Sequence, residues 1–155
     1  MAFVVLALRV LIGTLLLVAG ILKAHDGPAA TASAIAAYRI LPGVLNAPLG
    51  VFLPYFEIFL GTYLILGLLT RVVAAVASAQ FVLFAAAVAS LVVRHIPADC
   101  GCFGSSVSTP PSWSHVAFDV GLALLCALVA WHAPGAAALD RRFGLSSFAP
   151  LRDEG

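Results

Sequence analysis

The stretch "PLGVFLPYFEIFLGTYLILGLLTRVVAAVASAQFVLFAAAVASLVV", residues 48–93, holds two long apolar runs with almost nothing between them. The runs Pro48–Leu69 and Val72–Val93 are each long enough to cross the hydrocarbon core of a bilayer, which takes about 20 residues of helix. A chain inside lipid must satisfy its own backbone N–H and C=O groups, so both runs are expected to be helices. Only Thr70 and Arg71 connect them. The two helices are therefore expected to form a tight antiparallel hairpin.

Two further apolar runs flank this hairpin, at about Phe3–Leu22 and Val116–Trp131. The first has the length of a signal peptide, but no basic segment precedes it and Arg9 lies inside it, so we interpret it as a retained span. The 155 residues are 63% hydrophobic and only 10% charged, against about 25% charged in soluble domains. The sequence therefore predicts an all-α integral membrane protein with a bundle of four transmembrane helices.

Residues 1–134 are predicted to form this membrane domain, and residues 135–155 a cytoplasmic tail. The first outer loop contains "PAATASAIAAYRILP", residues 28–42, which begins with a proline suited to the first turn of a helix. Ile35, Tyr38 and Leu41 recur at helical spacing, so a short helix at the membrane interface is expected. Close contact between helices in lipid favours small residues. The glycines that suit such contacts are Gly13, Gly20, Gly61 and Gly67.

The distribution of lysine and arginine predicts the orientation in the membrane. With four spans, both termini share one side with the Thr70–Arg71 connection. The basic residues on that side are Arg71, Arg141, Arg142 and Arg152, and those on the opposite side are Lys23, Arg39 and Arg94. The larger group predicts that both termini are cytoplasmic. The net charge of +1 gives no reason to expect nucleic acid as a partner.

The stretch "ADCGCFG", residues 98–104, follows the third span and places two thiols one residue apart. Cys100 and Cys102 are close enough in the chain to form a disulfide, and Gly101 allows the tight backbone that such a bond requires. A disulfide over so short a loop stabilises the fold little and stores strain, and strained disulfides are easily reduced. The pair is therefore predicted to be redox-active. On the non-cytoplasmic side, thiols can persist as disulfides.

Several polar side chains are predicted to lie at the same end of the bundle. Lys23 marks the outer end of the first span, and Glu57 lies about 13 Å below the outer end of the second. Glu57 either pairs with Lys23 and joins two helices or handles protons, while Asp119 either anchors the loop or takes part in catalysis. The supporting site residues are Lys23, Glu57, Arg94, His95, Asp99, Gly101, His115 and Asp119. Arg9 and Gln80 fall toward the inner half and are candidates to bond one another across the first and third spans. Cys126, near the middle of the fourth span, is predicted to be a buried packing residue.

Three blocks of the chain resemble the MauE family of methylamine-utilisation membrane proteins, within the DoxX-like group. They are "GILKAHDGPAATASAIAAYRILP" (20–42), "LPYFEIFLG" (53–61) and "DCGCFG" (99–104), within a similarity over about residues 3–131. The resemblance implies a protein of the bacterial inner membrane that works beside a thioredoxin-like partner in periplasmic thiol–disulfide chemistry. Family members occur widely in bacteria without a methylamine pathway, so the resemblance does not imply that substrate.

The leading hypothesis is a thiol–disulfide oxidoreductase, or a component of one, in which Cys100 and Cys102 exchange disulfides with an extracytoplasmic thioredoxin-fold protein. One cysteine pair and the lone Cys126 exclude an internal relay of two pairs. Either a quinone meets the pair directly or a separate protein performs the other redox step, and we favour the separate protein. Two other classes of function stay open. One is binding of copper, zinc or mercury by Cys100, Cys102, His95 and His115; the other is a noncatalytic membrane anchor for an enzyme.

Overall fold

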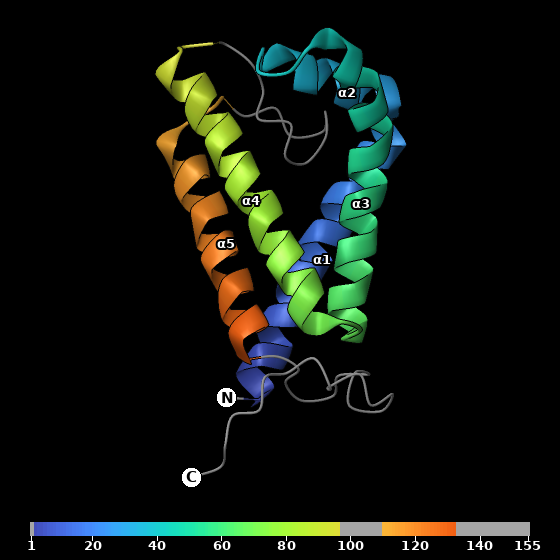
Figure 1. Ribbon diagram of the computed structural model, residues 1–155, viewed down its shortest axis with the longest axis vertical. Coiled ribbons are helices and arrows are strands. Elements are labelled where there is room, and N and C mark those ends of the chain that lie inside the picture. The colour runs from blue at the N-terminus through green and yellow to red at the C-terminus, as the bar shows by residue number, and fades with distance from the viewer. Residues whose placement is uncertain (1, 97–109, 133–155) are drawn as a thin grey trace.

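The computed structural model describes residues 2–96 and 110–132, and these form helices joined by short connections (Figure 1). The elements in chain order are α1 (Ala2–Asp26), α2 (Pro28–Ala37), the 3-10 helix η1 (Gly43–Leu45), α3 (Asn46–Leu66), α4 (Thr70–Val93) and α5 (Trp113–His132). Four helical stretches are long and apolar enough to cross a membrane, namely α1, η1 with α3, α4 and α5. The predicted four-helix membrane bundle is confirmed, with a short helix in the connection between the first two spans.

The helix ends differ from the predicted spans by a few residues. α1 continues past Leu22 to Asp26, because helical hydrogen bonding does not stop where the apolar run ends. Basic groups in its last turn, including Lys23, also suit the negative end of the helix dipole. α3 ends at Leu66, three residues early, because Gly67 takes the left-handed conformation at φ 70°. The cysteine-containing segment 97–109 and the predicted tail 135–155 lie outside the described residues.

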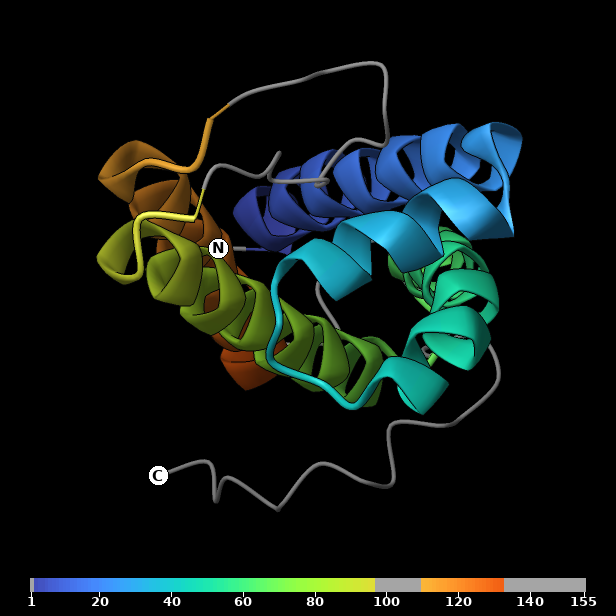
Figure 2. The same ribbon diagram turned by 90° about the horizontal axis from the view of Figure 1, so that it is seen from above.

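The bundle consists of two helix pairs that lean apart toward one end (Figure 1). α1 packs along α3, and α4 packs along α5, while contacts between the pairs are sparse. The tight packing of α3 against α4 that the sequence predicted is therefore wrong, because the short turn joins two helices that diverge from it. The pairs meet at the end where Gly67–Leu69 turns from α3 into α4, and they diverge toward the opposite end. There α2 crosses the opening, as the view along the bundle shows (Figure 2). This divergent end carries the site described below.

Glycines allow the backbones of α1 and α3 to touch. A Cβ atom on Gly61 would lie 2.6 Å from the carbonyl oxygen of Gly13, and one on Gly20 would lie 2.7 Å from that of Pro54. Such distances exclude any side chain unless the helices separate. The predicted packing role is confirmed for these three glycines. Gly67 instead ends α3, where its amide donates to the carbonyl of Tyr63.

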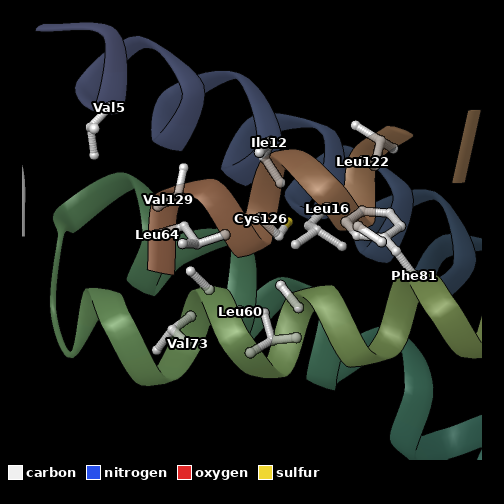
Figure 3. Packing of buried hydrophobic residues seen from close by; sticks show 13 residues of the cluster. Val5, Ile12, Leu16, Leu60, Leu64, Val73, Phe81, Leu122, Cys126 and Val129 are labelled. Carbon is white, nitrogen blue, oxygen red and sulfur yellow. The ribbon is translucent and has the colours of Figure 1, made fainter. Parts of the chain in front are cut away.

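The hydrophobic core draws on all four spanning helices (Figure 3). Ile12 of α1, Leu60 of α3, Phe81 of α4 and Leu122 of α5 belong to one buried cluster. Cys126 is 1% exposed and lies within that cluster. Its predicted role as a packing residue is therefore confirmed.

Candidate functional site

Four buried polar side chains, one from each spanning helix, lie toward the divergent end, and three of them are ionisable. Lys23 comes from α1, Glu57 from α3, Gln80 from α4 and Asp119 from α5, and each is at most 5% exposed. Polar groups inside a bilayer are costly and usually have a partner or a function. We call these four residues the polar cluster.

Glu57 is the centre of the hydrogen bonding in the polar cluster. The Lys23 ammonium donates to its Oε1 oxygen at 2.6 Å, and Gln80 Nε2 donates to the same oxygen at 3.2 Å. The Lys23 Nζ atom also lies 5.2 Å from the ring centroid of Phe84, at cation–π distance. The ion pair suggested by the sequence is present, and with Gln80 it links α1, α3 and α4.

Three acceptor oxygens of the polar cluster have no hydrogen-bond donor within residues 2–96 and 110–132. They are Glu57 Oε2, Gln80 Oε1 and Asp119 Oδ2. Lys23 is also close enough to Asp119 to attract its carboxylate electrostatically. Asp119 is attracted more strongly by His115 than by Lys23. The three acceptor oxygens suit a proton, a water molecule or a donor on a ligand.

A cavity of about 590 Å³ lies next to the polar cluster, at the divergent end of the bundle. α2 and the turn after it form one side, and α3 and α4 form the others. Among the lining residues that the structure describes, Lys23 is the only charged side chain. The principal apolar lining residues are Ile35, Ile40, Leu49, Leu53, Leu83 and Phe84. A cavity of this size and composition is typical of sites for small apolar ligands.

Three basic residues lie at the helix ends on the same side of the bundle as this cavity. Arg94, just after α4, donates from Nη1 to the backbone carbonyl of Tyr38 at 2.9 Å, which ties α4 to the end of α2. The His115 ring, near the start of α5, shares a 2.7 Å hydrogen bond with the Ser112 hydroxyl through Nδ1. His95 is exposed and has a left-handed backbone at φ 50°. All three basic residues therefore lie at the divergent end, as the sequence predicted.

The remaining predicted site residues, Asp99, Cys100, Gly101 and Cys102, lie outside the described residues. No cluster of three or more histidine, cysteine, aspartate or glutamate side chains suited to a metal occurs in the described part of the chain. The alternative metal site thus depends on the two cysteines.

The sequence suggests Arg9 as a partner for Gln80, whereas Gln80 donates to Glu57 in the structure. The sequence thus did not identify Gln80 as a member of the polar cluster, and it did not indicate the cavity. The signal for Gln80 was an amide within the otherwise apolar run of α4. Arg9 is a different kind of buried polar residue. Its Nε atom donates to the carbonyl of Leu64 at 3.1 Å and its Nη2 atom to that of Ile65 at 3.4 Å. It thereby satisfies carbonyls that the end of α3 leaves without helical donors.

Comparison with known proteins agrees with this arrangement of helices. The sequence profile of the family described as "Methylamine utilisation protein MauE" matches residues 1–132. This chain belongs to the MauE family. The match includes the whole polar cluster, the cavity and the Cys-Gly-Cys segment.

Three MauE proteins illustrate the similarity. The protein of Methylorubrum extorquens is 32% identical over 114 residues, which cover 71% of this chain and 61% of the relative. That of Paracoccus denitrificans is 32% identical over 64% of this chain and 54% of the relative. That of Methylophilus methylotrophus is 40% identical over 53% of this chain and 42% of the relative. The chain thus spans about half the length of these relatives. No solved structure matches it.

Proposed function

We propose that this MauE-family protein exchanges disulfides, through Cys100 and Cys102, with a thioredoxin-fold partner outside the cytoplasm. The observation that carries the proposal is the pair of thiols separated by a single glycine. Our proposal places the protein in the bacterial cell membrane with both termini in the cytoplasm, because the predicted inner side carries more arginine and lysine. The names of the relatives connect them with methylamine utilisation; for this chain we propose the exchange chemistry and not that substrate.

The fold supports this proposal through the helices that flank the cysteine segment. α4 ends at Val93, and α5 begins at Trp113, at the divergent end of the bundle. The chain between them therefore leaves from and returns to the end that holds α2, the cavity and the cations Lys23 and Arg94. Cations near a cysteine favour the thiolate, which is the nucleophile of disulfide exchange.

The proposed exchange conserves electrons and protons. A thiolate of the partner attacks one sulfur of the Cys100–Cys102 disulfide, and the other cysteine leaves as a thiolate that takes a proton. The second thiol of the partner then attacks the mixed disulfide. The partner loses two electrons and two protons and becomes a disulfide, while the Cys100–Cys102 pair becomes a dithiol. The reverse sequence reduces the partner.

The test is the capture of the mixed disulfide. A thioredoxin-fold protein that carries only its attacking cysteine is expected to form a covalent complex with the wild-type protein in membranes, visible as a mass shift that a reductant removes. Substitution of both cysteines, C100S/C102S, is expected to abolish the complex. Replacement of the buried Cys126 by alanine is the matched control and is expected to leave the complex intact.

Other outcomes would favour the alternative functions. Equal capture by the C100S/C102S variant would contradict the exchange proposal. A metal ion retained at one per chain by the reduced protein, and lost with C100S/C102S, would support metal binding. A C100S/C102S variant that forms no complex but still supports its partner enzyme in cells would support the role of a membrane anchor.

A further inference from the structure

We propose that the cavity under α2 binds a membrane quinone, whose ring carbonyl accepts a hydrogen bond from the Lys23 ammonium. The inference depends on three properties of the described residues, namely the lining of the cavity, the unused donors of Lys23 and the charge balance of the polar cluster. It concerns binding at α2, α3 and α4, and it requires neither Cys100 nor Cys102.

The lining suits a largely apolar molecule with one polar group. The cavity of about 590 Å³ falls in the range of roughly 300–1,000 Å³ that is usual for small-ligand sites. Its described walls consist mainly of aliphatic and aromatic side chains, with a few hydroxyl-bearing residues, and Lys23 is the single charged group among them. Such walls favour an apolar body, and the one ammonium fixes the position of one polar atom.

The Lys23 ammonium has capacity for another acceptor. An ammonium group carries three N–H donors. Among the described residues it donates to Glu57 Oε1, and one face lies over the ring of Phe84. Lys23 is only 3% exposed, so its remaining donors are directed into the protein interior and the adjoining cavity instead of bulk water. A carbonyl oxygen in the cavity would accept a hydrogen bond from a Lys23 N–H group, for which the hydrocarbon of the bilayer offers no acceptor.

The charge of the polar cluster selects a neutral acceptor. Lys23 is already paired with Glu57 at 2.6 Å, and the carboxyl group of Asp119, which His115 attracts more strongly, also interacts with the same ammonium. The carboxylate of a fatty acid or the phosphate of a lipid would therefore add an uncompensated negative charge in a region of low dielectric constant. A quinone carbonyl accepts the hydrogen bond without that cost.

The cavity also meets the surface that faces the hydrocarbon. Leu83 on α4 is 69% exposed and Ile40 after α2 is 50% exposed, and both line the cavity. A ligand can thus enter from the bilayer between α2 and α4, with its isoprenoid tail left against these side chains. If the exchange proposed above also holds, oxidation of the Cys100–Cys102 dithiol by the quinone would transfer two electrons and two protons and yield the quinol.

The test uses the full chain in phosphatidylcholine nanodiscs with a photoreactive azido-ubiquinone. Mass spectrometry of the peptides is expected to place the cross-link on α2 or α4. Decylubiquinone is expected to prevent the labelling, whereas decanoate at the same concentration, which has a chain of the same length and a carboxylate, is not. Labelling elsewhere, or equal protection by decanoate, would overturn the proposal.

Two variants and a matched control locate the site. Ala87 lines the cavity, so Ala87→Phe is expected to weaken decylubiquinone binding at least tenfold. Ala79 lies on the same helix but is exposed outside the cavity, so Ala79→Phe is expected to bind as wild type does. The double substitution Lys23→Met with Glu57→Gln removes the donor without leaving a lone charge and is expected to weaken binding about tenfold. Wild-type affinity in either cavity variant would contradict the site.

The same assay separates this proposal from the exchange proposal. The C100S/C102S variant is expected to bind decylubiquinone as the wild-type protein does, although it captures no partner. Capture of a partner without quinone labelling at α2 or α4 would overturn the quinone site alone. Quinone labelling there, without capture, would overturn the exchange proposal alone.

Discussion

Lys23 is held inside the bundle by interactions with three other helices. Its ammonium is paired with Glu57 of α3, lies over Phe84 of α4 and attracts Asp119 of α5. A buried ion pair adds little net stability, because desolvation offsets the attraction. Removing one partner is strongly destabilising, because the other charge then stays buried in a medium that cannot solvate it. The pair therefore makes the position of α1 against α3 specific.

We expect the substitution Lys23→Met to lower the free energy of unfolding by about 3–5 kcal/mol, because Glu57 is left buried without its cation. Adding Glu57→Gln to Lys23→Met is expected to recover most of that loss, since Gln80 can still donate to the side chain at position 57. The measurement is reversible unfolding by sodium dodecyl sulfate in mixed micelles, followed by circular dichroism. A Lys23→Met protein as stable as wild type would show that the pair is not buried in the membrane.

At the scale of elements, the contact between α1 and α3 depends on glycine. Lipid tails are as apolar as the helix surfaces, so close packing and not the hydrophobic effect holds these helices together. Gly13 and Gly61 bring the two backbones into contact, which positions Lys23 of α1 opposite Glu57 of α3. A side chain in this contact would push α1 and α3 apart, which would disturb both the backbone contact and the Lys23–Glu57 pair.

We expect Gly61→Ala to lower the free energy of unfolding by about 1–3 kcal/mol, as overpacking of a dense interface does. The matched control is Gly121→Ala on α5, where an added Cβ atom would meet no other atom within 4 Å. That substitution is expected to be neutral or to stabilise by up to about 1 kcal/mol, because alanine favours helix more than glycine does. The same micelle titration measures both. Equal effects at the two positions would contradict the close contact.

For the whole molecule, the sequence predicts the number of helices better than their arrangement. Bilayer thickness sets the length of an apolar span, so the four spans, the short turn between α3 and α4 and the helix that begins at Pro28 could all be predicted from residue types. The residue types did not indicate which face of each helix turns inward. Lipid and protein interior are both apolar, so the spans carry little amphipathic pattern. The adjacency of α1 and α3, the place of Gln80 and the cavity all depend on those rotations.

Orientation across the membrane is the property of the whole molecule on which the proposed exchange depends. The divergent end must face the oxidising side, because glutathione and thioredoxin keep thiols reduced in the cytoplasm. Two exposed positions mark the opposite ends of the bundle. Val44 in η1 lies at the divergent end beside α2, and Arg71 lies at the turn between α3 and α4.

We expect Val44→Cys, made in a protein whose Cys100 and Cys102 are serine, to react with a membrane-impermeant maleimide added to spheroplasts. Arg71→Cys is expected to react only in inverted membrane vesicles, and the buried Cys126 is expected to give little background in either preparation. The reverse pattern would put the divergent end in the cytoplasm. The cysteine pair would then face a reducing compartment, and the disulfide exchange proposed here would have no oxidising partner to act on.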